Sequence, residues 1–347
     1  MGLDTAAPPD YDAVVVVSFG GPEGPEEVMP FLRNVTRGRG VPTRRLEEVA
    51  EHYLRRGGRS PINDQNRRLV TALDSALSEA GVDLPVYWGN RNWHPTLAEA
   101  VEAMRADGAR RALAFVTSAF GSYSGCRQYR EDIARAVAGC DGALEIHKLR
   151  LYWNHPGFIE PMAEGVRGAL SRLAGAPSTG PARLVFSAHS IPTAMAAGAP
   201  YERQLRHAAG LIAERVPQGR EAGETDAWDL VYQSRSGTPS DPWLEPDVVD
   251  HLEALHREGV GDVVLAPLGF VSDHMEVIHD LDDEAAGAAA ALGIRLERSP
   301  TVGTHPAFVD MIVELIRERL DPGVPRRALG SAGPWPDFCA TDCCSRR

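Results

Sequence analysis

The sequence predicts an α/β fold of two similar doubly wound units, each with a parallel four-stranded sheet, and an active-site cleft between them. Short apolar runs alternate with stretches of helical periodicity along the 347 residues, the pattern of a parallel sheet covered by helices on both faces. This pattern starts again after the small-residue stretch 170–181, and residues 111–123 and 262–273 share one layout, a strand and then a loop with Gly and Phe. We therefore predict units at 1–155 and 156–325 and a cysteine-containing tail at 326–347.

In the first half, apolar runs predict strands at 11–18, from Leu84 onward, at 111–117 and at 144–152. Helical stretches end near Leu32 and cover 96–106 and 128–137. The glycine-rich loop after the first strand fails the G-x-G-x-x-G spacing, so a dinucleotide site there is not expected. The second half predicts strands at 183–187, 229–233, 262–266 and 294–298, and helices at 201–215, 248–257 and 306–320.

The bulk composition limits the classes of partner. A formal net charge of -12 makes the surface as a whole repel nucleic acid and anionic lipid. The N-terminus lacks the basic and apolar regions of a signal peptide, and the apolar runs are too short for a membrane span. We expect a soluble cytoplasmic protein without a transmembrane segment.

An arginine-dense segment between residues 33 and 68 reverses this charge locally. One interpretation is a helical hairpin with solvated cations, and the other is an anion site. Arg37, Arg39 and Arg59 lie in glycine-flanked, loop-like stretches, where guanidinium forks suit carboxylates.

A carboxylate stripe follows the strand at 262–266. On a helix, Glu276, Asp280 and Glu284 would share one face, with His274 just before them. Like charges in a row destabilise a helix unless a cation sits among them. The stripe is therefore either a solvated helix face or a metal or acid/base site.

Two other predicted strands of the second half also end in polar loops, one at His189 and one that contains Ser234. A single histidine is more often structural than functional. Because strand ends of one parallel sheet meet at one edge, these loops and the stripe are expected to converge.

Five cysteines are present, and three of them, Cys339, Cys343 and Cys344, lie in the last nine residues. In a cytosolic protein such clustering suggests metal binding more than disulfides. A tail with free thiols is the alternative.

Six short segments of the sequence carry further motifs: Ser18–Pro22, Gly58–Ile62, Phe186–Pro192, Gln233–Pro239, Asp241–Asp247 and Gly269–Glu276. Together they resemble the signatures of the ferrochelatase family, and most closely the coproporphyrin III ferrochelatases of Gram-positive bacteria. The resemblance covers about residues 11–320 and implies a chelatase-like fold and a lyase that inserts Fe2+ into coproporphyrin III to form coproheme. Protoporphyrin IX or another divalent metal as substrate, or a non-catalytic tetrapyrrole-binding protein, are the alternatives.

By this resemblance His189 accepts a pyrrole proton or ligates the metal, Glu276 acts on the opposite face, and His274 orients Glu276. Asp280 and Glu284 would line the path along which Fe2+ arrives. For the porphyrin, the resemblance implies stacking by Phe19, Tyr123 and Trp93, propionate contacts from Arg37, Arg39, Arg59 and Ser60, and a contact from Ser234. Related enzymes can carry a Tyr where this chain has Phe19, so no protein axial ligand is expected there.

The resemblance also implies a [2Fe–2S] cluster, because some ferrochelatases hold one with three C-terminal cysteines and one from the body of the chain. Cys339, Cys343 and Cys344 would supply three thiolates. Cys126, in a strand-end loop, is preferred as the fourth over Cys140, near a helix end. Transient handover to the preceding and following enzymes of heme synthesis is the expected partnership.

Overall fold

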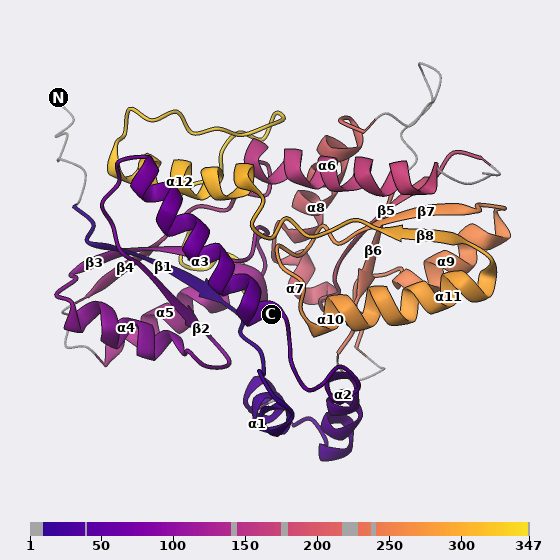
Figure 1. Ribbon diagram of the computed structural model, residues 1–347, viewed down its shortest axis with the longest axis horizontal. Coiled ribbons are helices and arrows are strands. Elements are labelled where there is room, and N and C mark those ends of the chain that lie inside the picture. The colour runs from indigo at the N-terminus through magenta and orange to yellow at the C-terminus, as the bar shows by residue number, and fades with distance from the viewer. Residues whose placement is uncertain are drawn as a thin grey trace.

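A computed structural model describes residues 10–38, 40–139, 144–174, 180–216, 228–236 and 241–345. Two parallel four-stranded sheets lie side by side in Figure 1, with strand orders β2-β1-β3-β4 and β6-β5-β7-β8. The predicted fold class is confirmed, and the matching strand orders explain why the two halves share a sequence layout. The strands are β1 (Ala13–Ser18), β2 (Val86–Asn90), β3 (Arg111–Val116), β4 (Glu145–Lys148), β5 (Arg183–His189), β6 (Trp228–Gln233), β7 (Asp262–Ala266) and β8 (Arg295–Arg298).

The central strands are apolar because helices cover both of their faces. β1 is buried along its whole length, and Val14–Ser18 pairs with Val86–Asn90 in parallel register. In the second sheet Phe186 of β5 lies opposite Leu230 of β6 and Ala266 of β7. The polar residues that follow these strands are thereby placed at one edge of each sheet.

Most predicted helices agree with the structure within a few residues. The described helices are α1 (Pro25–Val35), α2 (Thr43–Arg55), α3 (Ile62–Glu79), α4 (Leu97–Ala106), η1 (Tyr123–Arg127), α5 (Gln128–Ala138), α6 (Pro156–Leu173), α7 (Thr193–Ala197), α8 (Tyr201–Ala213), α9 (Val248–Arg257), α10 (Met275–Val277), η2 (Ile278–Ala285), α11 (Ala286–Leu292) and α12 (Pro306–Leu320). η1 and η2 are π-helical, with the wider i→i+5 hydrogen-bonded turn.

Two sequence expectations need correction. The stretch 170–181 does not break the chain at its start, because α6 continues to Leu173 and buries Phe158, Met162 and Val166 on one face. β4 is shorter than predicted and ends at Lys148, whereas β5 is longer and ends at His189. Extension of β5 makes His189 the last residue of a central strand rather than a loop residue.

Two helical layers connect the units. α12 packs against both α3 and α6 along one side of the molecule (Figure 1). On the other side α1 and α2 form a hairpin that reaches from the first unit toward α10, and Met275 of α10 joins the apolar cluster of this hairpin with Phe31 and Tyr53. Within the part of the chain described here, no helix is long and apolar enough to cross a membrane.

Candidate functional site

The ends of β5 and β7 bring His189 and Glu276 together. The Nε2 atom of His189 lies 3.7 Å from Oε2 of Glu276, and the two side chains are one-third and one-half exposed. This pair confirms that two of the expected strand-end segments converge, and it leaves both groups accessible to a ligand.

Local contacts determine the state of the His189 ring. Its Nδ1 atom lies 2.5 Å from the carbonyl oxygen of Ser190, which can only accept, so Nδ1 carries the proton. In the neutral ring this tautomer leaves the lone pair on Nε2, beside Glu276. The hydroxyl of Tyr201, at the start of α8, donates to the carbonyl of His189 at 3.0 Å and holds the strand end.

Close packing of backbone explains why the loop after β7 reaches β5. The amide of Gly269 donates to the carbonyl of Ser187 at 3.0 Å. A Cβ atom on Gly269 would lie only 2.8 Å from Cα of Ala188, so the residue must be glycine for the two segments to approach.

His274 lies behind Glu276. Its Nδ1 is 4.0 Å from the Glu276 carboxylate, and its ring meets the edge of Phe270 at a centroid distance of 5.1 Å. Burial lowers the pKa of His274, so the imidazole is neutral at physiological pH. A neutral ring can orient Glu276 without neutralising it.

η2 extends the carboxylate stripe away from His189. Gln233 donates to Asp280 at 3.3 Å, and the hydroxyl of Ser234 makes a short hydrogen bond to the same carboxylate. Ser234 has a φ of 61°, the left-handed region that costs a non-glycine residue about 1–2 kcal/mol, so the structure holds this hydroxyl toward Asp280 against backbone strain. Burial, and then the nearby charges of Glu276 and Glu284, raise the pKa of Asp280 to about 6.

One neighbour in η2 was missed by sequence reasoning. Ligand atoms of His279, Asp280 and Glu284 all lie within 4.8 Å of one another, a spacing that suits one cation. The i, i+4 argument selected the carboxylates and did not consider His279, because the argument used α-helical spacing whereas η2 is a π-helix.

The predicted anion-binding residues are more scattered. Ser60 is 2% exposed, and its amide donates to the carbonyl of Pro22 beneath the loop that follows β1. The guanidinium of Arg59 makes two hydrogen bonds, of 2.7 and 2.8 Å, to Asp64. Arg37 is exposed at the end of α1, and Arg39 lies outside the described residues.

Phe19 and the Tyr123 loop are connected by a residue that the motifs did not indicate, Arg91. Its guanidinium lies 6.0 Å from the Phe19 ring and donates to the carbonyl of Ser124 at 3.3 Å. The hydroxyl of Tyr123 donates to Glu131 at 3.0 Å. Arg91 is almost fully buried and pairs with Asp132, so only the tertiary contacts reveal it.

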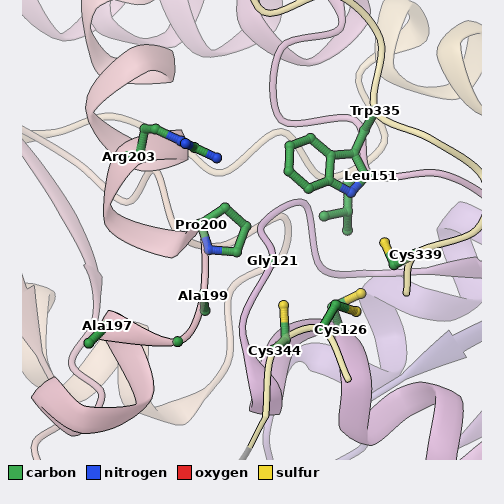
Figure 2. A pocket seen from close by; sticks show the side chains of 12 residues that line it. Gly121, Cys126, Leu151, Ala197, Ala199, Pro200, Arg203, Trp335, Cys339 and Cys344 are labelled. Carbon is green, nitrogen blue, oxygen red and sulfur yellow. The ribbon is translucent and has the colours of Figure 1, made fainter. Parts of the chain in front are cut away.

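Four cysteines line a separate pocket of about 400 Å³ (Figure 2). Cys126 in η1 and Cys344 are buried, and Cys339 and Cys343 are partly buried beside them; all four are free thiols. Cys140 lies outside the described residues.

Four thiols in one pocket match in number the four thiolates that an iron–sulfur cluster takes. Burial first, and then Cys126, Cys343 and Cys339, raise the pKa of Cys344 to about 12, because adjacent thiolates repel one another without a cation between them. Cys344 also has a φ of 50°, so its backbone is held in the left-handed region while its side chain faces the others.

Buried polar contacts hold the C-terminal tail against the rest of the chain before it reaches these cysteines. Arg150 and Glu318, both almost fully buried, make hydrogen bonds of 2.7 and 2.8 Å, and Arg150 also donates to the carbonyl of Arg327. Asn154 donates to the carbonyl of Gly333 at 2.8 Å. The tail is thus anchored on the first unit before Cys339.

Comparison with known proteins relates this fold and site to others. The family described as Ferrochelatase matches residues 11–320. Ferrochelatase of Rhodopirellula baltica is 51% identical over 97% of this chain and 94% of its own length. Coproporphyrin III ferrochelatase of Frankia alni is 54% identical (96% and 86% covered), and that of Nocardia farcinica is 53% identical (96% of each).

A solved structure agrees at the level of the fold. SirB from Bacillus subtilis with Fe3+ superposes with a TM-score of 0.53 at 14% identity, and the match covers 90% of this chain and 96% of SirB. Because the family match and these relatives span nearly the whole chain, this chain belongs to the ferrochelatase family.

Proposed function

We propose that this chain inserts Fe2+ into coproporphyrin III and releases coproheme. The observation that carries the proposal is the Nε2 atom of His189 facing Glu276 at 3.7 Å, in a chain about half identical to proteins named coproporphyrin III ferrochelatase. In the reaction the porphyrin loses two pyrrole N–H protons as the four nitrogens bind Fe2+, so charge and protons balance. Nε2 of His189 takes one proton and the Glu276 carboxylate, after it has passed the ion inward, takes the other.

The rest of η2 supports delivery of the ion. Asp280 and Glu284 offer oxygen ligands that bind Fe2+ loosely enough to release it toward Glu276. With a pKa of about 6, Asp280 is mostly ionised at pH 7 and mostly protonated below pH 6. The hydroxyl of Ser234 holds the Asp280 carboxylate in place.

For the porphyrin we propose that Phe19 and Tyr123 contact the macrocycle face, and that propionates bind near Arg37, Arg39, Arg59 and Ser60. Arg37 is exposed and is free to reach a carboxylate. Arg59 would have to exchange its pairing with Asp64 for a propionate. The four propionates of coproporphyrin give these cations partners in an otherwise acidic protein.

Anaerobic assays with coproporphyrin III and with protoporphyrin IX test the substrate. We expect coproheme to form, seen as a shift of the porphyrin absorption band, and little product from protoporphyrin. His189→Ala should lower turnover by about 100-fold or more while porphyrin binding, measured by fluorescence quenching, stays within about twofold. Equal turnover of both porphyrins would overturn the substrate, and an active His189→Ala chain would overturn the role of His189.

We further propose that Cys126, Cys339, Cys343 and Cys344 hold a [2Fe–2S] cluster, which would supply a redox-active group outside the porphyrin site. Burial raises the pKa of the Cys343 thiol, and Arg130, which donates to its sulfur at 3.4 Å, opposes that rise and so favours the thiolate that a cluster needs. Anaerobically purified protein should contain iron and sulfide and absorb in the visible range, and Cys344→Ser should lose that absorption. Retention of full absorption in the Cys344→Ser chain would exclude this ligand set.

Three further expectations, on compartment, domains and partners, accompany this proposal. Free thiols support a reducing, cytoplasmic compartment. Residues 1–155, 156–325 and 326–347 remain the proposed domains, and the packing of α6 on α8 and β8 supports a boundary near 155. Handover of coproporphyrin and coproheme between pathway enzymes is the proposed partnership.

A further inference from the structure

One hydrogen bond between the two units holds the start of the segment that carries His274 and Glu276. The backbone amide of Asp273 donates to Oε1 of Gln65 at 3.0 Å, and the two residues are 208 positions apart in the sequence. Gln65 lies in the first turn of α3, which starts between the two sheets (Figure 1). Because a backbone amide can only donate, this contact requires an acceptor oxygen on the Gln65 side chain.

The side chain of Asp273 is held by the second unit at the same time. Its carboxylate accepts from Arg298, the last residue of β8, at 3.1 and 3.4 Å, and from the hydroxyl of Thr301 at 3.3 Å. Arg298 also donates to the carboxylate of Asp282 in η2, at 2.5 and 3.1 Å. One guanidinium of the second unit therefore holds both ends of the stretch 273–282.

Gln65 ties the backbone of this stretch to the first unit. Asp273 directly precedes His274, whose extended backbone, with φ of -141° and ψ of 177°, forms the N-cap of α10. Glu276 follows within the single turn of α10. Rotation of the Asp273 peptide would therefore redirect both His274 and Glu276, and the hydrogen bond to Gln65 opposes that rotation.

The helix that carries Gln65 also starts at the proposed porphyrin contacts. Ser60 lies two residues before Ile62, where α3 begins, and Gln65 lies three residues after it. A helical turn is held by its own backbone hydrogen bonds, so its residues keep a fixed spacing. The distance between a propionate bound near Ser60 and the carboxylate of Glu276 is therefore set partly by the contact between Gln65 and Asp273.

We propose that Gln65 is a positioning residue, which sets Glu276 and His274 relative to the porphyrin that the first unit binds. The inference rests on the proposed function, in that Glu276 acts on a bound porphyrin. Gln65 acts through the backbone of Asp273 rather than on the reacting atoms. Loss of its acceptor oxygen therefore misplaces Glu276 in the reaction and leaves the groups that bind the porphyrin in place.

A matched pair of variants in the full chain tests this role. Gln65→Leu removes the acceptor, and Gln65→Glu keeps one of the same reach. In hydrogen exchange followed by mass spectrometry, a peptide that contains Asp273 should exchange about tenfold faster in Gln65→Leu and within about threefold of wild type in Gln65→Glu.

The anaerobic assay with coproporphyrin III supplies the second readout. We expect Gln65→Leu to lower kcat by about tenfold or more and to keep KM for the porphyrin within about twofold, and Gln65→Glu to restore most of kcat. Asp74→Leu, on the exposed face of the same helix, is the control and should behave as wild type in both measurements. Thermal unfolding of each variant confirms that it is folded.

Wild-type kcat in a Gln65→Leu chain whose Asp273 peptide exchanges faster would overturn the positioning role. A Gln65→Glu chain as impaired as Gln65→Leu, or an equal loss in Asp74→Leu, would overturn the need for an acceptor at this position. If the exchange results are as expected but the wild-type chain makes no coproheme, the proposed function is wrong, and the contact between Gln65 and the Asp273 amide stands.

Discussion

Replacement of Asp280 by Asn should make the protein more stable while impairing its metal delivery. The carboxylate is largely buried, and its pKa rises from the usual 3.8 to about 6. The folded state therefore holds this proton more tightly than the unfolded state. Ionisation of Asp280 lowers stability above the folded pKa, and this penalty disappears as pH falls below the unfolded pKa.

The size of the effect follows from the shift. A shift of about two units corresponds to about 3 kcal/mol at pH 8, and the same linkage leaves about 1.6 kcal/mol at pH 5. Asn keeps the shape, and its carbonyl can still accept from Ser234 and Gln233. The gain of Asp280→Asn over wild type should therefore fall by about 1.4 kcal/mol between pH 8 and pH 5.

Urea unfolding of metal-free protein at pH 8, 6.5 and 5 measures this gain. Asp283→Asn is the matched control, because hydrogen bonding to Arg56 lowers the pKa of Asp283. The stabilisation that ionised Asp283 provides is present above pH 3.8 and is lost only as pH falls further. The Asp283→Asn variant should therefore be less stable than wild type by the same amount at all three pH values. If Asp280→Asn gains no stability, or gains the same amount at every pH, the inference that Asp280 is ionised in a buried position at pH 8 is wrong.

Two further variants test the packing that supports the sites. Arg150→Met should destabilise the chain by about 3 kcal/mol, because it leaves the buried Glu318 with only the longer contact to Arg326. The double variant Arg150→Met, Glu318→Leu should recover much of this loss when thermal unfolding is measured. If stability does not recover, the ion pair is not the cause. Gly269→Ala should destabilise the protein by about 1–3 kcal/mol and lower turnover, since the new Cβ would strike Ala188. Gly287→Ala in α11, where the Cβ would meet open space, should instead stabilise the protein by about 0.5–1 kcal/mol. Equal effects of the two substitutions would contradict the close approach at Gly269.

Local patterns identified much of the fold. Helix periodicity gave α9 and α12 their observed bounds, and the run Asp262–Ala266 was recognised as a strand because every residue of a covered parallel strand is buried. The end of β5 was misjudged, because Ala188 and His189 continue the ladder with β6, and sequence pattern does not report hydrogen bonding to a neighbouring strand.

By itself the sequence determined the two-unit α/β fold, the family and the positions of His189, His274 and Glu276, since these depend on local periodicity and on short motifs of characteristic spacing. Only the tertiary structure decided which atoms meet. The Nε2 of His189 faces Glu276 because Gly269 lets the loop after β7 pack against the end of β5, and Arg56 reaches Asp283 across 227 residues of sequence. Contacts of this kind depend on how separate elements pack, which no local pattern encodes. The carboxylate stripe after β7 was therefore visible at once in the sequence, but its neighbour His279 was not.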